Sequence, residues 1–108
     1  MDENEFDRYT VVLLRRPESY PELTDEQLED LQARHLAHND AMVRAGHMLV
    51  AGPTGREWDD SLRGICIYRC DLERARELTE ADPMVEIGWL GYEAFTWWTR
   101  KDALRGAR

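Results

Sequence analysis

Two histidines on the inward side of a predicted helix are the first residues in this sequence that could do acid–base chemistry. Apolar residues with a helical period of about 3.6 occur at Leu28, Leu31, Met42 and Ala45. The positions that continue this stripe are His35 and His38. Histidine changes its protonation state near neutral pH, which suits a general acid or base. An inward histidine can equally be a hydrogen-bonded core residue, so both interpretations stay open at this point.

Other kinds of reactive site have less support in the sequence. Two histidines three residues apart could supply two ligands to a metal, but a stable site needs more, and no Cys/His cluster supplies them. Cys66 and Cys70 lie in one expected strand over residues 63–70, too far apart there to form a disulfide with each other. No G-x-S-x-G nucleophile motif is present. We therefore expect neither a metal nor a cofactor.

The helix that carries the histidines has clear end signals. Thr24 and Gln27 match a capping box, with Thr24 as the N-cap residue, and Gly46 stands where a left-handed residue would end the helix. The pattern therefore predicts a helix over residues 25–45. A short run of apolar and β-branched residues before it predicts a strand over residues 9–14.

The rest of the chain alternates between strand and helix signals. We predict a strand over 47–51 that Gly52-Pro53 breaks, an exposed loop over 54–62, and a strand over 63–70. Asp71 is expected to cap a helix over 72–81, and Asp82-Pro83 either closes that helix or begins another short turn. A last strand is predicted over 89–98, before a polar tail over 99–108 that is expected to fray.

The order of these elements, β-α-β-β-α-β, predicts an α+β protein of the ferredoxin-like kind. Such a fold has one antiparallel four-stranded sheet with two helices on one face. The length of 108 residues fits a single domain, 1–108, with its core over about 8–98.

The second face of this sheet also carries apolar residues. The strand over 9–14 contains four consecutive apolar residues, Val11 to Leu14, and Trp97 and Trp98 place aromatic rings on both faces of the last strand. Two helices cover only one face, so we expect a twofold homodimer that packs sheet against sheet. The alternative is that the last strand is an edge strand with some exposed aromatic side chains.

Composition limits the partners of this protein. Acidic residues outnumber basic ones, 22 to 14, for a net charge of −8, which disfavours binding to the phosphates of nucleic acid. No apolar run approaches the roughly 20 residues that span a bilayer, and residues 1–7 are acidic and polar rather than signal-like. We expect a cytoplasmic protein with no nucleic-acid or membrane partner.

Several short motifs, taken in order, resemble the YCII-related (YciI-like) family. His35-Leu36-Ala37 is followed by the run from Ala45 through Ala51-Gly52-Pro53, and later by Ala81-Asp82-Pro83-Met84-Val85 and Gly88. Aromatic residues near the end of the last strand, such as Trp97 and Trp98, also fit. Each motif alone is weak, but together they extend over nearly the whole chain, from about Tyr9 to Trp98.

The resemblance implies a homodimer whose cleft holds a His/Asp pair, here His35 and Asp82. It implies a cofactor-free enzyme that performs elimination, of a dehydrohalogenase-like kind, or isomerisation on a small organic substrate. We expect Gly52, Pro53 and His38 to contact that substrate, the glycine by letting the backbone approach it closely. Asp82 could instead be only a helix cap, and Gly52-Pro53 only a turn. The alternative function is a non-catalytic small-molecule-binding or protein-interaction module.

Overall fold

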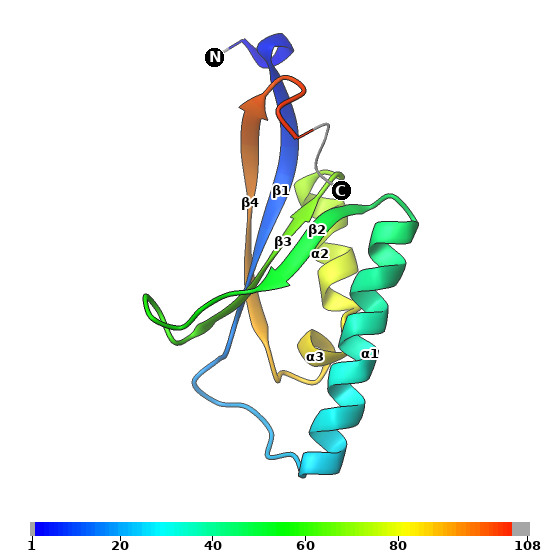
Figure 1. The fold of residues 1–108 in the computed structure, drawn as a ribbon, viewed down its shortest axis with the longest axis vertical. Helices are drawn as coiled ribbons and strands as arrows, with labels where there is room; N and C mark the ends of the chain where they lie inside the picture. Colours follow the sequence, from blue (N-terminus) through cyan, green and yellow to red (C-terminus); the bar gives the residue numbers. More distant parts are fainter. Residues whose placement is uncertain (1, 105–108) are drawn as a thin grey trace.

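The structure is a computed structural model that describes residues 2–104 (Figure 1). Its strands are β1 (Phe6–Arg15), β2 (Met48–Pro53), β3 (Leu62–Tyr68) and β4 (Gly91–Arg100). Its helices are the 3-10 turn η1 (Glu3–Glu5), α1 (Asp25–Arg44), α2 (Leu72–Glu80) and the short α3 (Pro83–Glu86). The predicted order of elements is confirmed, with η1 and α3 as additions.

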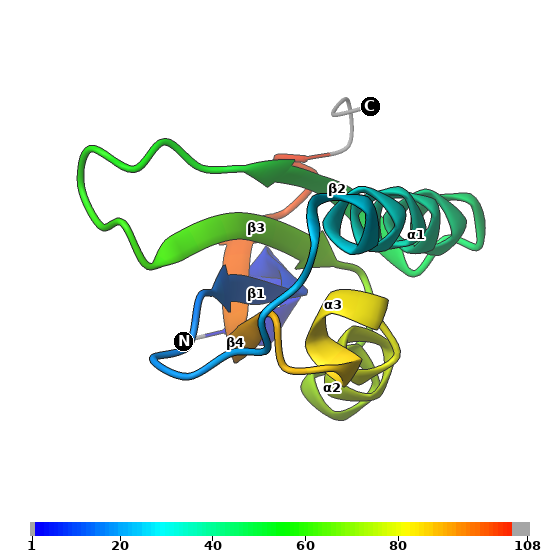
Figure 2. The ribbon, with the colours of Figure 1, turned by 90° about the horizontal axis from the view of Figure 1, so that it is seen from below.

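The four strands form one antiparallel sheet in the order β2-β3-β1-β4. Figure 2 shows α1, α2 and α3 on the same side of this sheet, with α1 beside β2 and the other two beside β1 and β4. This is the ferredoxin-like α+β arrangement that the sequence predicted.

The core lies between the helices and one face of the sheet. Alternate residues of β1, among them Val12 and Leu14, point into it, and Cys66 and Tyr68 do so from β3. Leu31 is the one buried residue of α1, which therefore lies at the rim of the core rather than across it. A long helix with a single buried residue leaves room for a cavity beside it.

The predicted helix ends are confirmed. The Thr24 hydroxyl accepts from the Gln27 backbone N–H, and the Gln27 side chain accepts from the Thr24 N–H. Gly46 follows the C-cap of α1 with a φ of +82°, a left-handed conformation that favours glycine. Asp71 caps α2 through the N–H of Arg74.

Several predicted boundaries were wrong. Gly52-Pro53 does not break β2, which runs through Pro53; proline is tolerated there because β2 is an edge strand. β3 ends at Tyr68, so Cys70 lies beyond the strand. β4 begins at Gly91 and continues through Arg100, and Thr99 in the supposed fraying tail is buried. Residues 105–108 of that tail lie outside the described residues.

The face of the sheet away from the helices carries exposed apolar side chains. Phe95, Trp97 and Ile65 point to this side and are 45, 40 and 36% exposed. β4 is an edge strand, as the alternative interpretation supposed. Within residues 2–104, no helix combines the length and the apolar character that crossing a bilayer requires.

Candidate functional site

His35 and Asp82 meet beneath the middle of α1. The Nδ1 atom of His35 lies 2.7 Å from Oδ2 of Asp82, within the distance expected of a direct hydrogen bond. The His35 side chain is 12% exposed and that of Asp82 only 5%. Two residues 47 positions apart in the chain therefore form a largely desolvated pair.

The local fold around Asp82 explains this meeting. Asp82 is the N-cap of α3, and its Oδ1 accepts from the Met84 backbone N–H at 3.0 Å. Pro83 occupies the first position of α3, where its fixed φ suits a helix start. The cap holds one carboxylate oxygen, which leaves the other to face His35. The role of Asp82 as a cap and its contact with His35 therefore coexist.

The pair determines which ring nitrogen of His35 is available. A carboxylate only accepts hydrogen bonds, so Nδ1 carries the ring proton and donates a hydrogen bond to Asp82. Nε2 then keeps its lone pair, and its one hydrogen-bond contact within residues 2–104 is to the Asn39 side-chain amide, at 3.5 Å. Such a long contact is weak, so Nε2 can accept a proton from a ligand.

His35 forms part of the wall of a cavity of about 500 Å³ between α1 and the β2–β3 side of the sheet. This volume is in the range that holds a small organic molecule. Its apolar lining includes Leu14, Leu36, Val43, Ala51, Met84, Trp89 and Leu90. Its polar lining includes Arg16, Gln32, His35, Asn39, Asp40, Arg56 and Arg63.

The structure brings most of the predicted site residues together. Gly52 and Pro53 line the same cavity as His35, and Asp82 lies behind His35. His38 does not line this cavity. It faces inward as predicted, but its Nε2 is buried and has no hydrogen-bond partner within the described part of the chain.

The crowded glycine at this cavity is Gly64 rather than Gly52. A Cβ atom at Gly52 would meet nothing within 4 Å, whereas one at Gly64 would lie 3.2 Å from the Gly52 carbonyl oxygen. Close backbone approach therefore explains a glycine at position 64, where β3 passes β2. Gly52 instead leaves open space at the cavity wall.

Cys66 also lines the cavity but is poorly suited to act as a nucleophile. It is 3% exposed, and burial, followed by the nearby Asp82 charge, raises the pKa of its thiol to about 12. The thiolate is the reactive form of cysteine, so this side chain is inert near neutral pH.

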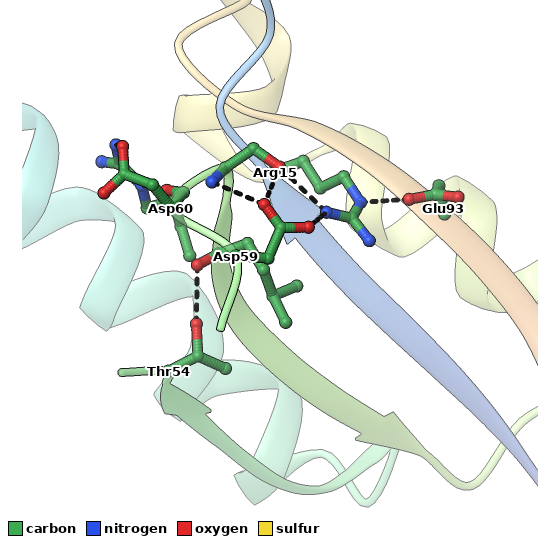
Figure 3. Close-up of polar contacts among 8 residues, drawn as sticks. Arg15, Thr54, Asp59, Asp60 and Glu93 are labelled. Atoms are coloured by element: carbon green, nitrogen blue, oxygen red, sulfur yellow. Dashed lines mark hydrogen bonds and ion pairs between the residues drawn. The ribbon is translucent and has the colours of Figure 1, made fainter. Parts of the chain in front are cut away.

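A polar network fixes the loop between β2 and β3 (Figure 3). Arg15, at the end of β1, donates to Asp59 at 2.7 Å and also pairs with Glu93 of β4. Asp59 accepts further hydrogen bonds from the Ser61 N–H and hydroxyl. Hydrogen bonds from Arg15, then from Ser61, lower the pKa of Asp59 below its ordinary value. Trp58, in the same loop, is 81% exposed.

Sequence reasoning missed the cationic lining of the cavity. Arg16, Arg56 and Arg63 all reach it, although the loop that carries Arg56 was predicted only to be exposed. A signal for Arg16 was present, because Arg16 directly follows Arg15, the last residue of β1, and the alternation of an extended chain sends neighbouring side chains to opposite sides. Across residues 2–104, no three His, Cys, Asp or Glu side chains gather as metal ligands.

This chain matches a family model in sequence and a solved structure in fold. No curated protein matches it in sequence. The chain is similar in structure to the 5-chloro-2-hydroxyhydroquinone dehydrochlorinase of Burkholderia phenoliruptrix, solved in complex with 2,5-dihydroxybenzoquinone. The TM-score is 0.55 at 21% sequence identity, over 83% of this chain and 92% of that one. The family model of the YCII-related domain matches residues 8–97. This chain therefore belongs to the YCII-related domain family.

Proposed function

We propose that this protein is a small cofactor-free enzyme in which His35 and Asp82 perform acid–base chemistry on a small organic substrate. The observation that carries the proposal is the 2.7 Å contact between His35 Nδ1 and Asp82 Oδ2 at the wall of a substrate-sized cavity. A histidine sealed among apolar side chains would favour a structural role. His35 instead forms part of the cavity surface.

The geometry gives each residue a role. Asp82 fixes the ring orientation and tautomer, and its charge stabilises the imidazolium once that forms. Nε2 of His35 takes a proton from a carbon or hydroxyl of the substrate. In an elimination, the electron pair left by that proton forms a new double bond, and a leaving group departs with its own bonding pair. In an isomerisation, the same nitrogen returns the proton to another atom of the substrate.

Dehydrohalogenation is the first reaction to test. In this reaction a proton passes to His35 and a halide leaves, so the substrate loses one equivalent of hydrogen halide. The structural neighbour is a dehydrochlorinase of a chlorinated hydroquinone, which supports this choice of substrate class. Pro53 and the open space at Gly52 are proposed to lie along the bound substrate.

The experiment is a halide-release assay on a panel of chlorinated hydroquinones and other small halogenated acids and phenols. His35→Ala should lower turnover by about 10²-fold or more, which is typical of losing a general base. Asp82→Asn should lower it too, because an amide supplies no charge to the imidazolium. His47→Gln is the matched control, since His47 follows α1 and does not line the cavity.

Two results would count against the proposal. Turnover that persists unchanged in His35→Ala would remove the histidine from the chemistry. Binding of panel members without turnover, under conditions where the neighbour's activity is measurable, would favour the non-catalytic binding module instead.

A further inference from the structure

Arg16, at the wall of the cavity, forms no ion pair with a carboxylate of residues 2–104. Its guanidinium lies over the rings of Trp89, 4.0 Å from the centroid, and Tyr20, 4.7 Å from the centroid. Those rings pack edge to face at 5.3 Å. Its Nε is buried and makes no hydrogen bond to any described residue. A guanidinium has five N–H donors, and aromatic faces satisfy none of them.

The contrast with the preceding residue is informative. Arg15 meets two carboxylates, Asp59 and Glu93, on the other side of the sheet. The chain has 22 acidic residues for 14 basic ones, so a shortage of carboxylates does not explain why Arg16 lacks an ion-pair partner among the described residues. Instead the aromatic pair holds the guanidinium in place and leaves its donors for something else.

The cavity lining contains further positively charged side chains besides Arg16. Arg56 and Arg63 join Arg16 in its lining, which has the single acidic residue Asp40. Arg63 is paired with Asp60 at 3.6 Å, which leaves Arg56 and Arg16 as the cations that face a ligand. Asp40 is already paired with Arg44 at 2.6 Å. A cavity that carries excess positive charge in a protein of net charge −8 favours an anionic ligand.

The remaining lining is apolar, which limits what kind of anion fits. Leu14, Met84 and Leu90 are buried side chains that present hydrocarbon to the cavity. Inorganic anions make no use of such a surface. An organic acid does, because its oxyanion can face the arginines while its apolar body covers the hydrocarbon.

We propose that this cavity takes a small organic anion and that Arg16 is the residue that binds its carboxylate or phenolate oxygen. This proposal rests on the proposed function, because the ligand that Arg16 binds is the substrate that reaches His35 in the same cavity. Arg16 is thus a specificity-determining residue, and the neutral form or an amide analogue of a substrate is discriminated against.

The experiment is calorimetric titration of the intact protein with benzoate, its neutral isostere benzamide, and phenolates that are ionised at the working pH. Benzoate should bind about tenfold or more tightly than benzamide, since a charge-assisted hydrogen bond is worth at least that much. Comparison of benzoate with the phenolates distinguishes the two sources of the oxyanion. Equal affinities for benzoate and benzamide would overturn the proposal.

Substitutions of Arg16 test whether this residue causes the preference for benzoate over benzamide. Arg16→Gln should bind benzoate and benzamide alike, and Arg16→Lys should restore part of the difference because it keeps the charge but not the planar fork. Arg15→Gln is the matched control and should bind benzoate as the wild type does. An Arg16→Gln variant that still prefers benzoate would overturn the assignment.

Two further measurements keep the test decisive. If Arg16→Gln fails to fold, NMR titration of the wild type with benzoate should shift the Trp89 indole N–H, and an unmoved Trp89 signal would contradict the site. His47→Gln, which changes a residue outside the cavity lining, should retain benzoate affinity within about twofold. Anion binding that depends on Arg16 in a protein with no turnover would therefore remove only the proposed function. Turnover that depends on His35 but is indifferent to Arg16→Gln would remove only this inference.

Discussion

At the scale of single residues, Asp82 connects local structure with the candidate chemistry. One of its oxygens caps α3 and the other meets His35. The inward position of His35 could be predicted from the helical stripe alone. The partner could not, because nothing in a helical period says which residue of another element will lie level with it; the family motif supplied Asp82.

This double role predicts an unequal response to two substitutions. Asp82→Ala removes the cap and leaves buried His35 without its partner, so it should lower the free energy of unfolding by about 2–3 kcal/mol. Asp82→Asn should cost less, about 1 kcal/mol, because its single carbonyl oxygen can keep the cap on the Met84 N–H. Its amide NH2 then faces His35 and can bond to Nδ1 only in the other ring tautomer. Urea unfolding measures both values.

Asp71→Ala is the control for the cap alone. Asp71 caps α2 from an exposed position, with one hydrogen bond to the Arg74 N–H. Its removal should cost about 1 kcal/mol. If Asp82→Ala costs no more than Asp71→Ala, the contact with His35 contributes nothing to stability.

A second prediction at this scale concerns Cys66. Because burial raises the pKa of its thiol to about 12, Cys66 stays protonated at pH 8. Iodoacetamide should therefore modify the partly exposed Cys70 first and Cys66 only through opening of the fold. Mass spectrometry of the labelled peptides measures the two rates. Equal rates in the native protein, rather than only in concentrated urea, would contradict the burial argument.

At the scale of elements, the sequence predicted helices better than strand ends. Thr24, Gln27 and Gly46 are local signals whose physics acts within a few residues, and all three operate as expected. Strand ends depend on a neighbouring strand. Pro53 stays in β2 because it pairs with Gly64 at the sheet edge, and that pairing is not written in the residues around Pro53.

The position of the loop over residues 54–61 could not be predicted from the sequence. Arg15 holds it through Asp59, so Arg15→Met should increase the motion of the loop while the fold persists. Heteronuclear NOE values for loop amides and for the Trp58 indole should fall. Arg34→Met, which removes the exposed pair with Asp30 within α1, should leave them unchanged. An unchanged Trp58 signal in Arg15→Met would show that backbone hydrogen bonds hold the loop instead.

Acid should loosen the same loop. Because the pKa of Asp59 is lowered in the folded protein, its favourable contribution is complete above the ordinary value of 3.8 and is lost as the pH falls below it through the folded pKa. The Trp58 NOE should therefore fall in that acidic range in the wild type. Arg15→Met should show a smaller change, since its Asp59 has lost the cation that lowers the pKa.

At the scale of the whole molecule, the open face of the sheet is still to be explained. Its residues Ile65, Phe95 and Trp97 are exposed. Val11 of β1 lies on the same face, between Ile67 of β3 and Phe95 of β4. A contiguous apolar face on a sheet is typical of an interface. We propose that a second copy of the chain covers it by twofold packing of sheet on sheet, since the same patch then serves both protomers.

Light scattering at micromolar concentration should then give twice the chain mass of 12.7 kDa. Phe95→Glu combined with Trp97→Glu should give a folded monomer, because each charge would be buried without a partner in the interface but sits in water on a free sheet face. Ile87→Glu is the control: Ile87 is 43% exposed beside α3, on the helical side of the sheet, and should leave the mass doubled. A monomeric wild type would refute the packing. A double variant that is still a dimer would show that the interface lies on another surface. Either result would leave Phe95 and Trp97 of β4 without a packing partner among the described elements, because the described helices all lie on the opposite face.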